Sequence, residues 1–380
     1  MLKLHFDMNN YFASIEMLDK PELKNIPMVV CGDPKIRHGI VLSRNDLAKK
    51  LGIIAGESIN SAHKKCPSLK LIIADYEKYL NFTKKARLIY QKYTDKVYPY
   101  GMDECWLEVD LDYNDAYKLA LKIMNEIKDN LNLKVSSGIS YNFIFAKLAS
   151  DQKKMEPFVI SEDNFKSIAW SMPAFNLLFV GSKTRTKLKN MGILTIGDLA
   201  NYDELKIKSS LGKNGVMIQE FAKGNDTLFT PYLLNDEEIK SMGSSITLPK
   251  DINFYEDACD FLYVICHVLR KRLIKHQYKA QVVNLIIKDH NFIKYSKQKK
   301  LVHPSDDTKE IYLTVINLLN ECFDFSTTIR SIGIRLSELV QSNYEQISLN
   351  IFDEDDLLER KIQALENKYG EISLNFNRGR

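Results

Sequence analysis

The sequence predicts an α+β protein of several domains, in which an interleaved strand–helix region precedes a helical region and a final β-α-β-β-α-β region. Three observations lead to this prediction. At 380 residues the chain is long enough for about two to four domains. Short strand-like runs and amphipathic helical segments alternate up to residue 160. Short glycine-separated helical patches follow, and then a second set of strands begins.

The first region gives elements in a regular succession. In order they are a strand at 2–7, a turn at Asn9 and Asn10, a helix at 11–18, strands at 28–31 and 39–42, a helix at 45–51, a helix at 76–93, two strands within 96–109, a helix at 115–131, a strand at 135–140 and a helix at 142–150. Gly52 is a natural helix stop, and Gly101 is the expected break between two strands. Such interleaving is typical of an α/β or α+β domain whose sheet is covered by helices.

Two further regions follow. Residues 166–230 are short helical patches, and residues 229–240, with Pro231 and an acidic run, predict a linker. Strands are then expected at 243–248, 280–288, 292–300 and 328–336, with helices at 255–274 and 306–321. This order is the split βαβ arrangement of ferredoxin-like folds. A charged helix is expected at 357–369.

The composition is that of an ordinary soluble protein, with 45% hydrophobic and 27% charged residues. The net charge of +4 gives no overall basic field, so the local distribution of charge matters more. Six cysteines without C-x-x-C spacing favour free thiols in a reducing cytosol. The chain begins with a strand-like run rather than a signal peptide, and its longest apolar stretch, 261–269, is too short to span a bilayer. These features predict a cytoplasmic protein.

Three acidic residues at the edges of apolar runs are the main candidates for chemistry. Asp7 ends the first strand, and Asp103 and Glu104 follow Gly101. Neighbours on a regular strand point to opposite faces, so Asp103 and Glu104 can share a site only at a turn. Three carboxylates could converge on hard divalent cations, as in two-metal phosphoryl or nucleotidyl transfer. The alternatives are a helix cap for Asp7 and two solvated turn acids.

Aromatic and basic residues extend this candidate site. Tyr11 and Phe12 could form an aromatic wall beside a nucleotide sugar, although core packing is the alternative for both. Lys147, on the helix at 142–150, could neutralise a triphosphate, although a lone lysine is more often only solvated.

Residues 179–200 resemble a helix-hairpin-helix. A glycine turn leads into a basic helix, and a second turn at 191–193 precedes a helix that opens at Thr195. Such a hairpin grips DNA phosphate with backbone N–H groups and lysines. The candidate contacts are Gly181, Lys183 and Lys187, and the alternative is an ordinary αα-hairpin.

Basic residues also cluster in the last region, within 270–300. Lys294, Lys297 and Lys299 lie on or near one predicted strand. A basic sheet face there would suit phosphate contacts along a duplex, and a charged surface without a ligand is the alternative.

Taken in order, these motifs resemble the Y-family, or translesion, DNA polymerases, in the bacterial polymerase IV/UmuC-like branch. Residues 7–16 resemble the first catalytic motif, residues 102–107 the second, and residues 137–142 and 145–151 with Lys154 the third. The match runs through most of the chain. It implies a polymerase right hand with a palm (1–18 and 77–165), small fingers (19–76), a helical thumb (166–233), a linker (234–240), a DNA-binding little finger (241–340) and a C-terminal tail (341–380).

The resemblance implies two Mg²⁺ ions held by Asp7, Asp103 and Glu104 with the backbone carbonyl of Met8.

It also implies nucleotide contacts. These fall on Asn10, Tyr11, Phe12, Lys49 and Lys154, with Phe12 as a steric gate against the ribose 2′-OH and Lys154 on the triphosphate. Two departures put the triphosphate contacts in doubt. Asp46 stands where the family often has Tyr, and Met155 replaces the usual Pro after Lys154.

The tail resembles the short peptide by which such polymerases bind the sliding clamp (beta subunit), with one extra residue before Phe352. The implied contacts are Gln346, Leu349, Ile351 and Phe352. An extended apolar peptide of this kind docks in a surface groove. The alternative is an ordinary last strand.

These observations predict a low-fidelity translesion DNA polymerase that adds dNTPs to a primer on a DNA template, and the chain is expected to be monomeric. One alternative is a nucleotide cyclase on a palm-like fold, but a cyclase has no duplex for the hairpin and the basic C-terminal region to hold. The other is a non-catalytic clamp- or DNA-binding factor, but all three carboxylates are present.

Overall fold

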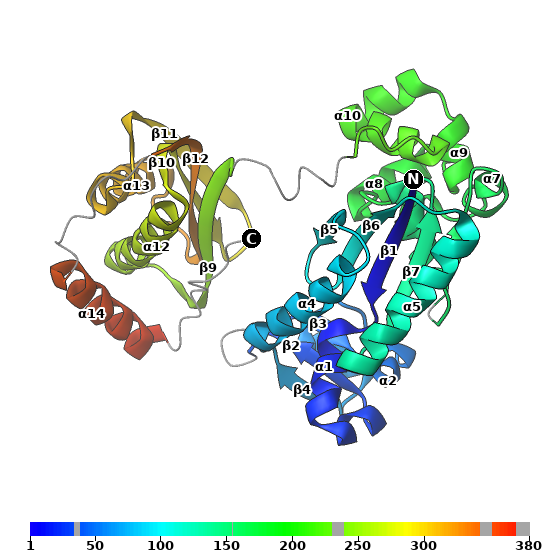
Figure 1. Cartoon of the computed structure of the whole chain (residues 1–380). Helices are drawn as coiled ribbons and strands as arrows, with labels where there is room; N and C mark the ends of the chain where they lie inside the picture. The colour runs from blue at the N-terminus through cyan, green and yellow to red at the C-terminus, as the bar shows by residue number, and fades with distance from the viewer. Residues whose placement is uncertain (34–38, 154, 230–238, 343–351, 370–380) are drawn as a thin grey trace. The chain divides into compact units, whose positions relative to one another are not determined.

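The computed structural model describes residues 1–33, 39–153, 155–229, 239–342 and 352–369. The chain divides into two compact units. The first comprises Met1–Gly32 and Ile40–Asp236, and the second contains Glu237–Arg380. Figure 1 labels the helices and strands of both.

A five-stranded sheet forms the centre of the first unit, in the order β5-β6-β1-β7-β8. The strands are β1 Leu2–Met8, β5 Val97–Tyr100, β6 Glu104–Val109, β7 Val135–Ser140 and β8 Phe158–Ile160. The helices packed with them are α4 Tyr76–Gln91, α5 Tyr113–Leu131 and α6 Phe143–Ser150. The central strand β1 runs antiparallel to both of its neighbours.

The two faces of this sheet differ in chemistry. Leu4 and Phe6 of β1 are buried in a core shared with α4 and α5, which lie side by side (Figure 1). The alternating residues Lys3, His5 and Asp7 therefore point to the opposite face. Their partners on β6 are Glu108, Trp106 and Glu104 in that order. One face of the sheet is thus apolar, and the other carries the polar candidates.

A three-stranded sheet, in the order β3-β2-β4, forms a smaller body in the same unit. Its strands are β2 Met28–Cys31, β3 Val41–Arg44 and β4 Lys70–Ile73, accompanied by α1 Tyr11–Asp19, η1 Pro21–Asn25, α2 Asp46–Lys50 and α3 Ile59–Lys65. The buried side chain of Asn45 organises it. Asn45 caps α2 by accepting from the Ala48 N–H and donates to the carbonyls of Leu23 and Ile26.

Five further helices lie in the described part of the first unit after β8. They are α7 Phe165–Ile168, η2 Ala174–Asn176, α8 Ser182–Asn190, α9 Ile196–Asn201 and α10 Glu204–Lys223. A capping box between Thr195 and Asp198 starts α9. Gly212 interrupts α10, because its φ of 63° and ψ of −149° are not helical.

The second unit is built on a four-stranded antiparallel sheet, in the order β11-β10-β12-β9. Its elements are β9 Ser241–Ile252, α12 Tyr255–His276, β10 Tyr278–Asp289, β11 Lys294–Ser305, α13 Thr308–Cys322 and β12 Ile329–Gln341. The chain order β-α-β-β-α-β is confirmed. β12 lies between β9 and β10, and β10 lies between β11 and β12, so each strand–helix–strand unit is split by one strand.

A last helix, α14 Phe352–Tyr369, packs on α12. Leu358, Leu365 and Tyr369 join the core of the second unit. Lys368 contacts both carboxylate oxygens of the buried Asp257 at 2.8 Å, and the Tyr369 hydroxyl donates to the same carboxylate. The charged helix expected at 357–369 is confirmed and begins earlier.

Two expectations from composition can be compared with the structure. All six cysteines are free, and Cys31, Cys66, Cys105 and Cys266 are buried, which confirms the prediction of free thiols. No helix in the described part of the chain is long and apolar enough to cross a membrane.

Candidate active site

Asp7 and Glu104 lie opposite each other on β1 and β6, at the end of the polar face of the five-stranded sheet. Asp103 precedes β6 in the turn that follows Gly101, whose φ is 71°. The Met8 N–H donates to the Asp103 carbonyl at 3.0 Å, which fixes this turn beside the end of β1. The predicted turn is therefore present and brings Asp103 to the same edge as the other two acids. Asp7 does not cap α1, because the N-cap position of that helix is Asn10.

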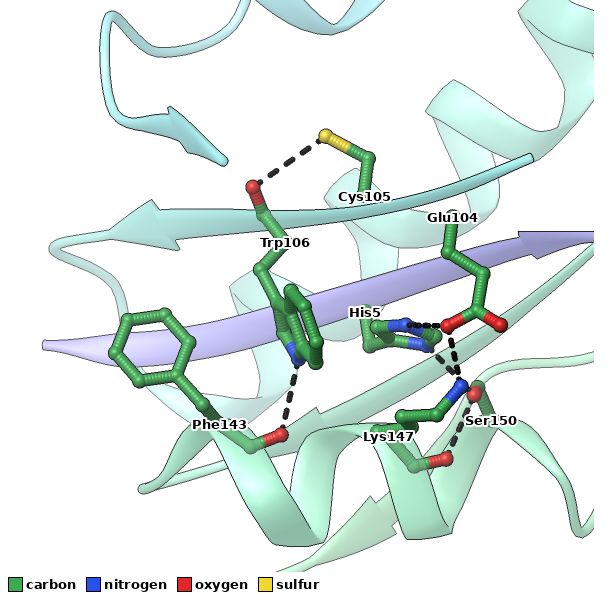
Figure 2. Close-up of polar contacts among 7 residues, drawn as sticks. All are labelled: His5, Glu104, Cys105, Trp106, Phe143, Lys147 and Ser150. Carbon is green, nitrogen blue, oxygen red and sulfur yellow. Dashed lines mark hydrogen bonds and ion pairs between the residues drawn. The ribbon is translucent and has the colours of Figure 1, made fainter. Parts of the chain in front are cut away.

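Lys147 of helix α6 and His5 of strand β1 approach the Glu104 carboxylate (Figure 2). Lys147 forms an ion pair with Glu104 Oε2, and His5 Nε2 lies 3.2 Å from the same oxygen. The His5 ring is fully buried beside Trp106, and its Nδ1 lies 2.7 Å from Ser150 Oγ. Lys147 was considered above as a triphosphate partner, but the structure pairs it with the carboxylate.

Gly138 allows α6 to approach this closely. It lies opposite His5 on β7, and a Cβ atom there would be 2.1 Å from the Ala146 carbonyl oxygen and 2.3 Å from the Ser150 nitrogen. Backbone therefore packs directly on backbone at this point, and only glycine fits.

The pKa values of the acids at this edge of the sheet are shifted by burial and by one another's charge. Burial, with the nearby charges of Glu104 and Asp103, raises the pKa of Asp7 to about 7. Burial and the Glu104 charge raise the pKa of Asp103 to about 6. Burial also acts to raise the pKa of Glu104, but the contacts with His5 and Lys147 outweigh it, so that pKa is lowered. Burial lowers the pKa of His5 to about 4.

The side-chain oxygens of these acids are of the kind that binds divalent cations. Carboxylate oxygens are the ligands that hard cations prefer, and the two partly buried acids Asp7 and Asp103, whose pKa values are raised, would gain from an added positive charge. Among the described residues, however, no three acidic, His or Cys side chains are gathered into a ready-made metal cluster. The Glu104 carboxylate forms an ion pair with Lys147, which compensates its charge.

The first turn of α1 holds the predicted nucleotide contacts. Asn10 has a left-handed backbone (φ 49°), and its side-chain amide donates to Asp46 of α2 at 2.9 Å. Phe12 is half-buried and stacks on Tyr79 of α4 with ring centroids 4.3 Å apart. It is therefore fixed in position and also partly accessible.

Tyr11, in contrast, belongs to the core. Its ring is 3% exposed, and its hydroxyl donates to the Tyr79 carbonyl and lies 2.8 Å from Thr83 Oγ1. The expectation that its side chain contacts a nucleotide is wrong, because the alternation of buried positions on α1 turns this ring inward.

Two lysines, Lys49 and Lys154, are the predicted triphosphate contacts. Lys49 is exposed on α2, one turn from Asp46. Lys154 lies outside the described residues.

The helix-hairpin-helix is present in α8 and α9, joined by a turn at Gly192 with φ 78°. Gly181 occupies the N-cap position of α8, and nothing lies within 4 Å of its virtual Cβ, so the backbone is open to a phosphate. Lys183 is exposed. Lys187 donates to the Ser210 carbonyl, so this side chain also braces α10.

The three predicted lysines of β11 do not share one face of the sheet. Lys297 and Lys299 are paired with the buried residues Leu285 and Val283, and Lys297 forms an ion pair with Glu321 of α13. Both therefore lie on the helix-covered side. Lys294 lies on the open side, because side chains on a strand alternate. The expectation of one basic face formed by these lysines is wrong.

Arg335, which the sequence analysis missed, also lies on the open side. It is exposed, and it pairs with Asn284 in a row that continues to Gln298 of β11. The register of the sheet was needed to identify it.

The predicted clamp-binding contacts Gln346, Leu349 and Ile351 lie outside the described residues. Strand β12 ends at Gln341, and Phe352 begins α14.

Comparison with protein families matches both units of the chain. The model described as the impB/mucB/samB family matches residues 6–151, and that of the family's C-terminal domain matches residues 239–349. DNA polymerase IV of Acetivibrio thermocellus is 40% identical over 370 residues, covering 96% of this chain and 92% of the relative. DNA polymerase IV of Clostridium kluyveri is 34% identical over 383 residues, covering 96% and 94%.

Solved structures have the same fold. A Y-family DNA polymerase chimera of Dbh and Dpo4 has a TM-score of 0.78 at 23% sequence identity, covering 90% of this chain and all of that one. DinB from Sulfolobus solfataricus has a TM-score of 0.57 at 22% identity, with the same coverage.

Proposed function

The chain belongs to the impB/mucB/samB family of Y-family DNA polymerases, and on that premise we propose that the edge formed by Asp7, Asp103 and Glu104 is the site at which it extends a primer. The enzyme is a DNA-directed DNA polymerase of the translesion class. The supporting observation is the cross-strand pairing of Asp7 with Glu104, with Asp103 held at the same edge by the Met8 N–H.

The three carboxylates and the Met8 carbonyl would hold two Mg²⁺ ions. When bound, such ions lower the pKa of the primer 3′-OH and stabilise the pyrophosphate leaving group. The contribution of the chain is the placement of the three carboxylates, of which the sheet fixes Asp7 and Glu104 and one hydrogen-bonded turn fixes Asp103.

The incoming dNTP is assigned to the first turn of α1. Phe12, which is braced by Tyr79, would face the sugar and exclude a 2′-OH by steric overlap. Lys49 and Lys154 would contact the triphosphate. The Asn10–Asp46 hydrogen bond joins α1 to α2 and would hold the two sides of the nucleotide site together.

The primer-template is assigned to two surfaces. The backbone at Gly181 and the Lys183 side chain would contact phosphates from the helical region. In the second unit, Lys294 and Arg335 on the open side of the sheet replace the three-lysine face expected from the sequence. The sliding clamp would bind the peptide 346–352, and the enzyme would act as a monomer.

The test is primer extension on an undamaged template and on a template with one damaged base. Wild type should extend both. Asp103→Ala should lower the rate of incorporation about a thousandfold or more, since each ligand supports several kcal/mol of transition-state stabilisation. DNA binding, measured by fluorescence anisotropy, should be retained.

Asp110→Ala is the matched control. Asp110 follows the other end of the same strand and is exposed, so its removal should leave extension unchanged. Full activity in Asp103→Ala would contradict the assignment of the site. Family membership argues against the nucleotide cyclase considered above, and the retained acid set argues against a non-catalytic factor.

A further inference from the structure

Two side chains orient the carboxylate of Glu104, which matters for function if Glu104 is a cation ligand as proposed above. Both described contacts of its side chain fall on one oxygen. Lys147 and His5 approach Oε2, whereas Oε1 makes no hydrogen bond or ion pair with any residue that the structure describes. Oε1 is therefore the oxygen presented at the acidic edge.

Lys147 and His5 differ in how they can hold this carboxylate. A lysine ammonium is a point charge on a flexible stem and specifies little direction. The His5 ring is rigid, fully buried and packed against Trp106, with ring centroids 4.8 Å apart. Its Nε2 is buried and does not meet the geometry of a hydrogen bond to any described group, although it lies only 3.2 Å from Glu104 Oε2. A buried polar atom in that position requires a partner.

The protons of His5 and Ser150 can be arranged in two ways. The Ser150 hydroxyl has one proton and two acceptors within reach, the Lys147 carbonyl at 2.8 Å and His5 Nδ1 at 2.7 Å. If the hydroxyl donates to the Lys147 carbonyl, Nδ1 must carry the ring proton and donate to the Ser150 oxygen. The unprotonated Nε2 then faces a carboxylate oxygen, and two lone pairs repel each other. If Nδ1 accepts the hydroxyl proton, the ring proton lies on Nε2, the nitrogen that faces Glu104 in Figure 2.

We propose that His5 is a positioning residue for Glu104. Its Nε2–H donates to Oε2, and Ser150 fixes this tautomer by donating to Nδ1. The chain Ser150–His5–Glu104 thereby holds the direction of Oε1 when the Lys147 ion pair loosens. Partners behind a metal ligand commonly fix it in this way, and their removal weakens metal binding about 10- to 100-fold.

The first test is a direct observation of the tautomer. Nitrogen-15 NMR of the full chain should show the ring proton of His5 on Nε2, with the His5 signal among those of the seven histidines identified by its absence from the spectrum of His5→Gln. A His5 proton on Nδ1 would overturn the proposal. Ser150→Ala should lower the Nε2–H fraction. Ser137→Ala should not, because the Ser137 hydroxyl is buried in β7 without a hydrogen-bond partner among the described residues.

The second test compares two amides at position 5. Glutamine can place its N–H₂ where Nε2 lies, and asparagine can reach only the Nδ1 position. Manganese binding, followed by the electron paramagnetic resonance signal of free Mn²⁺ added alone, should weaken about tenfold or more in His5→Asn and about threefold or less in His5→Gln. Equal weakening of manganese binding in both variants would mean that His5 only packs and does not position Glu104. Thermal unfolding shows whether each variant folds. If a variant does not fold, the tautomer of His5 in the wild-type protein tests the proposal.

The two proposals can fail separately. A wild-type chain that extends no primer would refute the proposed function but would leave the tautomer and the manganese result unchanged. An active chain with an Nδ1–H tautomer would refute only the positioning role.

Discussion

Asp7 lies directly opposite Glu104 in the ladder between β1 and β6, so the strand register itself places two carboxylates side by side. Like charges in this arrangement destabilise a sheet. The same face continues with His5 opposite Trp106 and with Lys3 opposite Glu108, where an ion pair of 2.8 Å forms. The end of the ladder proposed as the active site instead places two acids opposite each other, so the sheet is less stable there.

This cost predicts a pH dependence of stability without metal. The pKa of Asp7 is raised from 3.8 to about 7, so its contribution to stability is present below pH 4 and is lost as pH rises through about 7. In buffer with chelator, Asp7→Asn should therefore raise the free energy of unfolding, by about 2–3 kcal/mol more at pH 8 than at pH 5. Denaturant unfolding measures this, with Asp110→Asn as the control. A gain that is larger at pH 5 would have the wrong sign for the assigned shift.

Phe12→Ala should admit ribonucleotides. Truncation leaves room for the 2′-OH, and the discrimination between dNTP and rNTP in single-nucleotide incorporation should fall at least about tenfold. Tyr11→Phe is the matched control, because the neighbouring ring is buried and loses only its hydroxyl contacts. That variant should lose stability and keep its sugar discrimination. If the two variants discriminate like wild type, Phe12 is only a packing residue.

The open side of the second unit's sheet should carry more of the salt-dependent DNA affinity than the covered side. Lys294→Ala combined with Arg335→Ala should flatten the log–log salt slope by up to about two units, at about 0.9 for each lost phosphate contact. Lys297→Ala combined with Lys299→Ala should change it less, because Lys297 is paired with Glu321. Anisotropy titrations at several salt concentrations would measure both slopes, and the opposite ranking would place DNA on the other face.

Clamp stimulation should depend on the peptide 346–352 and should be tested by substitution rather than deletion. Deletion would leave residues 342–345 to connect β12 with α14, which is anchored in the core of the second unit. Leu349→Ala with Phe352→Ala should remove stimulation by the clamp and leave distributive synthesis intact. Ser348→Ala serves as the control. Stimulation that survives the double substitution would place the clamp contact elsewhere.

Two adjacent leucines test whether α14 is part of the second unit. Leu358 is 5% exposed and Leu357 is 46% exposed. Leu358→Ala should destabilise the second unit by about 2–4 kcal/mol, because it opens a cavity in the core. Leu357→Ala should change its stability by about 0.5 kcal/mol or less. Hydrogen exchange of α12 amides reports on this unit, and equal effects of the two substitutions would mean that α14 is not docked.

Much of the fold could be predicted because hydrophobic periodicity dominates it. Strands β2 and β7 coincide with the predicted spans, and β2 is an apolar run bounded by turns. Helix α3 and strand β4 were missed. Residues 59–65 carry few apolar side chains, and β4 is a half-exposed edge strand that owes its place to parallel pairing with β2. Long-range pairing of that kind leaves little trace in local sequence.

Only part of the candidate site could be predicted from the sequence. The turn geometry of Asp103 followed from Gly101 alone. The contacts of His5 and Ser150 did not, because they join residues 145 positions apart through the packing of a helix on a sheet. The lysines of β11 show the opposite failure. Their spacing was visible, but the face on which each lies depends on register, and one residue of difference reverses it.

Gly138 has a consequence beyond its fit between β7 and α6. Any side chain there would have to push the helix outward, and Lys147 and Ser150 would move away from the acids together. The chain could then retain all three carboxylates and still be inactive. Such a defect would be invisible to a search for missing catalytic groups, so the integrity of this enzyme has to be judged at a residue that takes part in no chemistry.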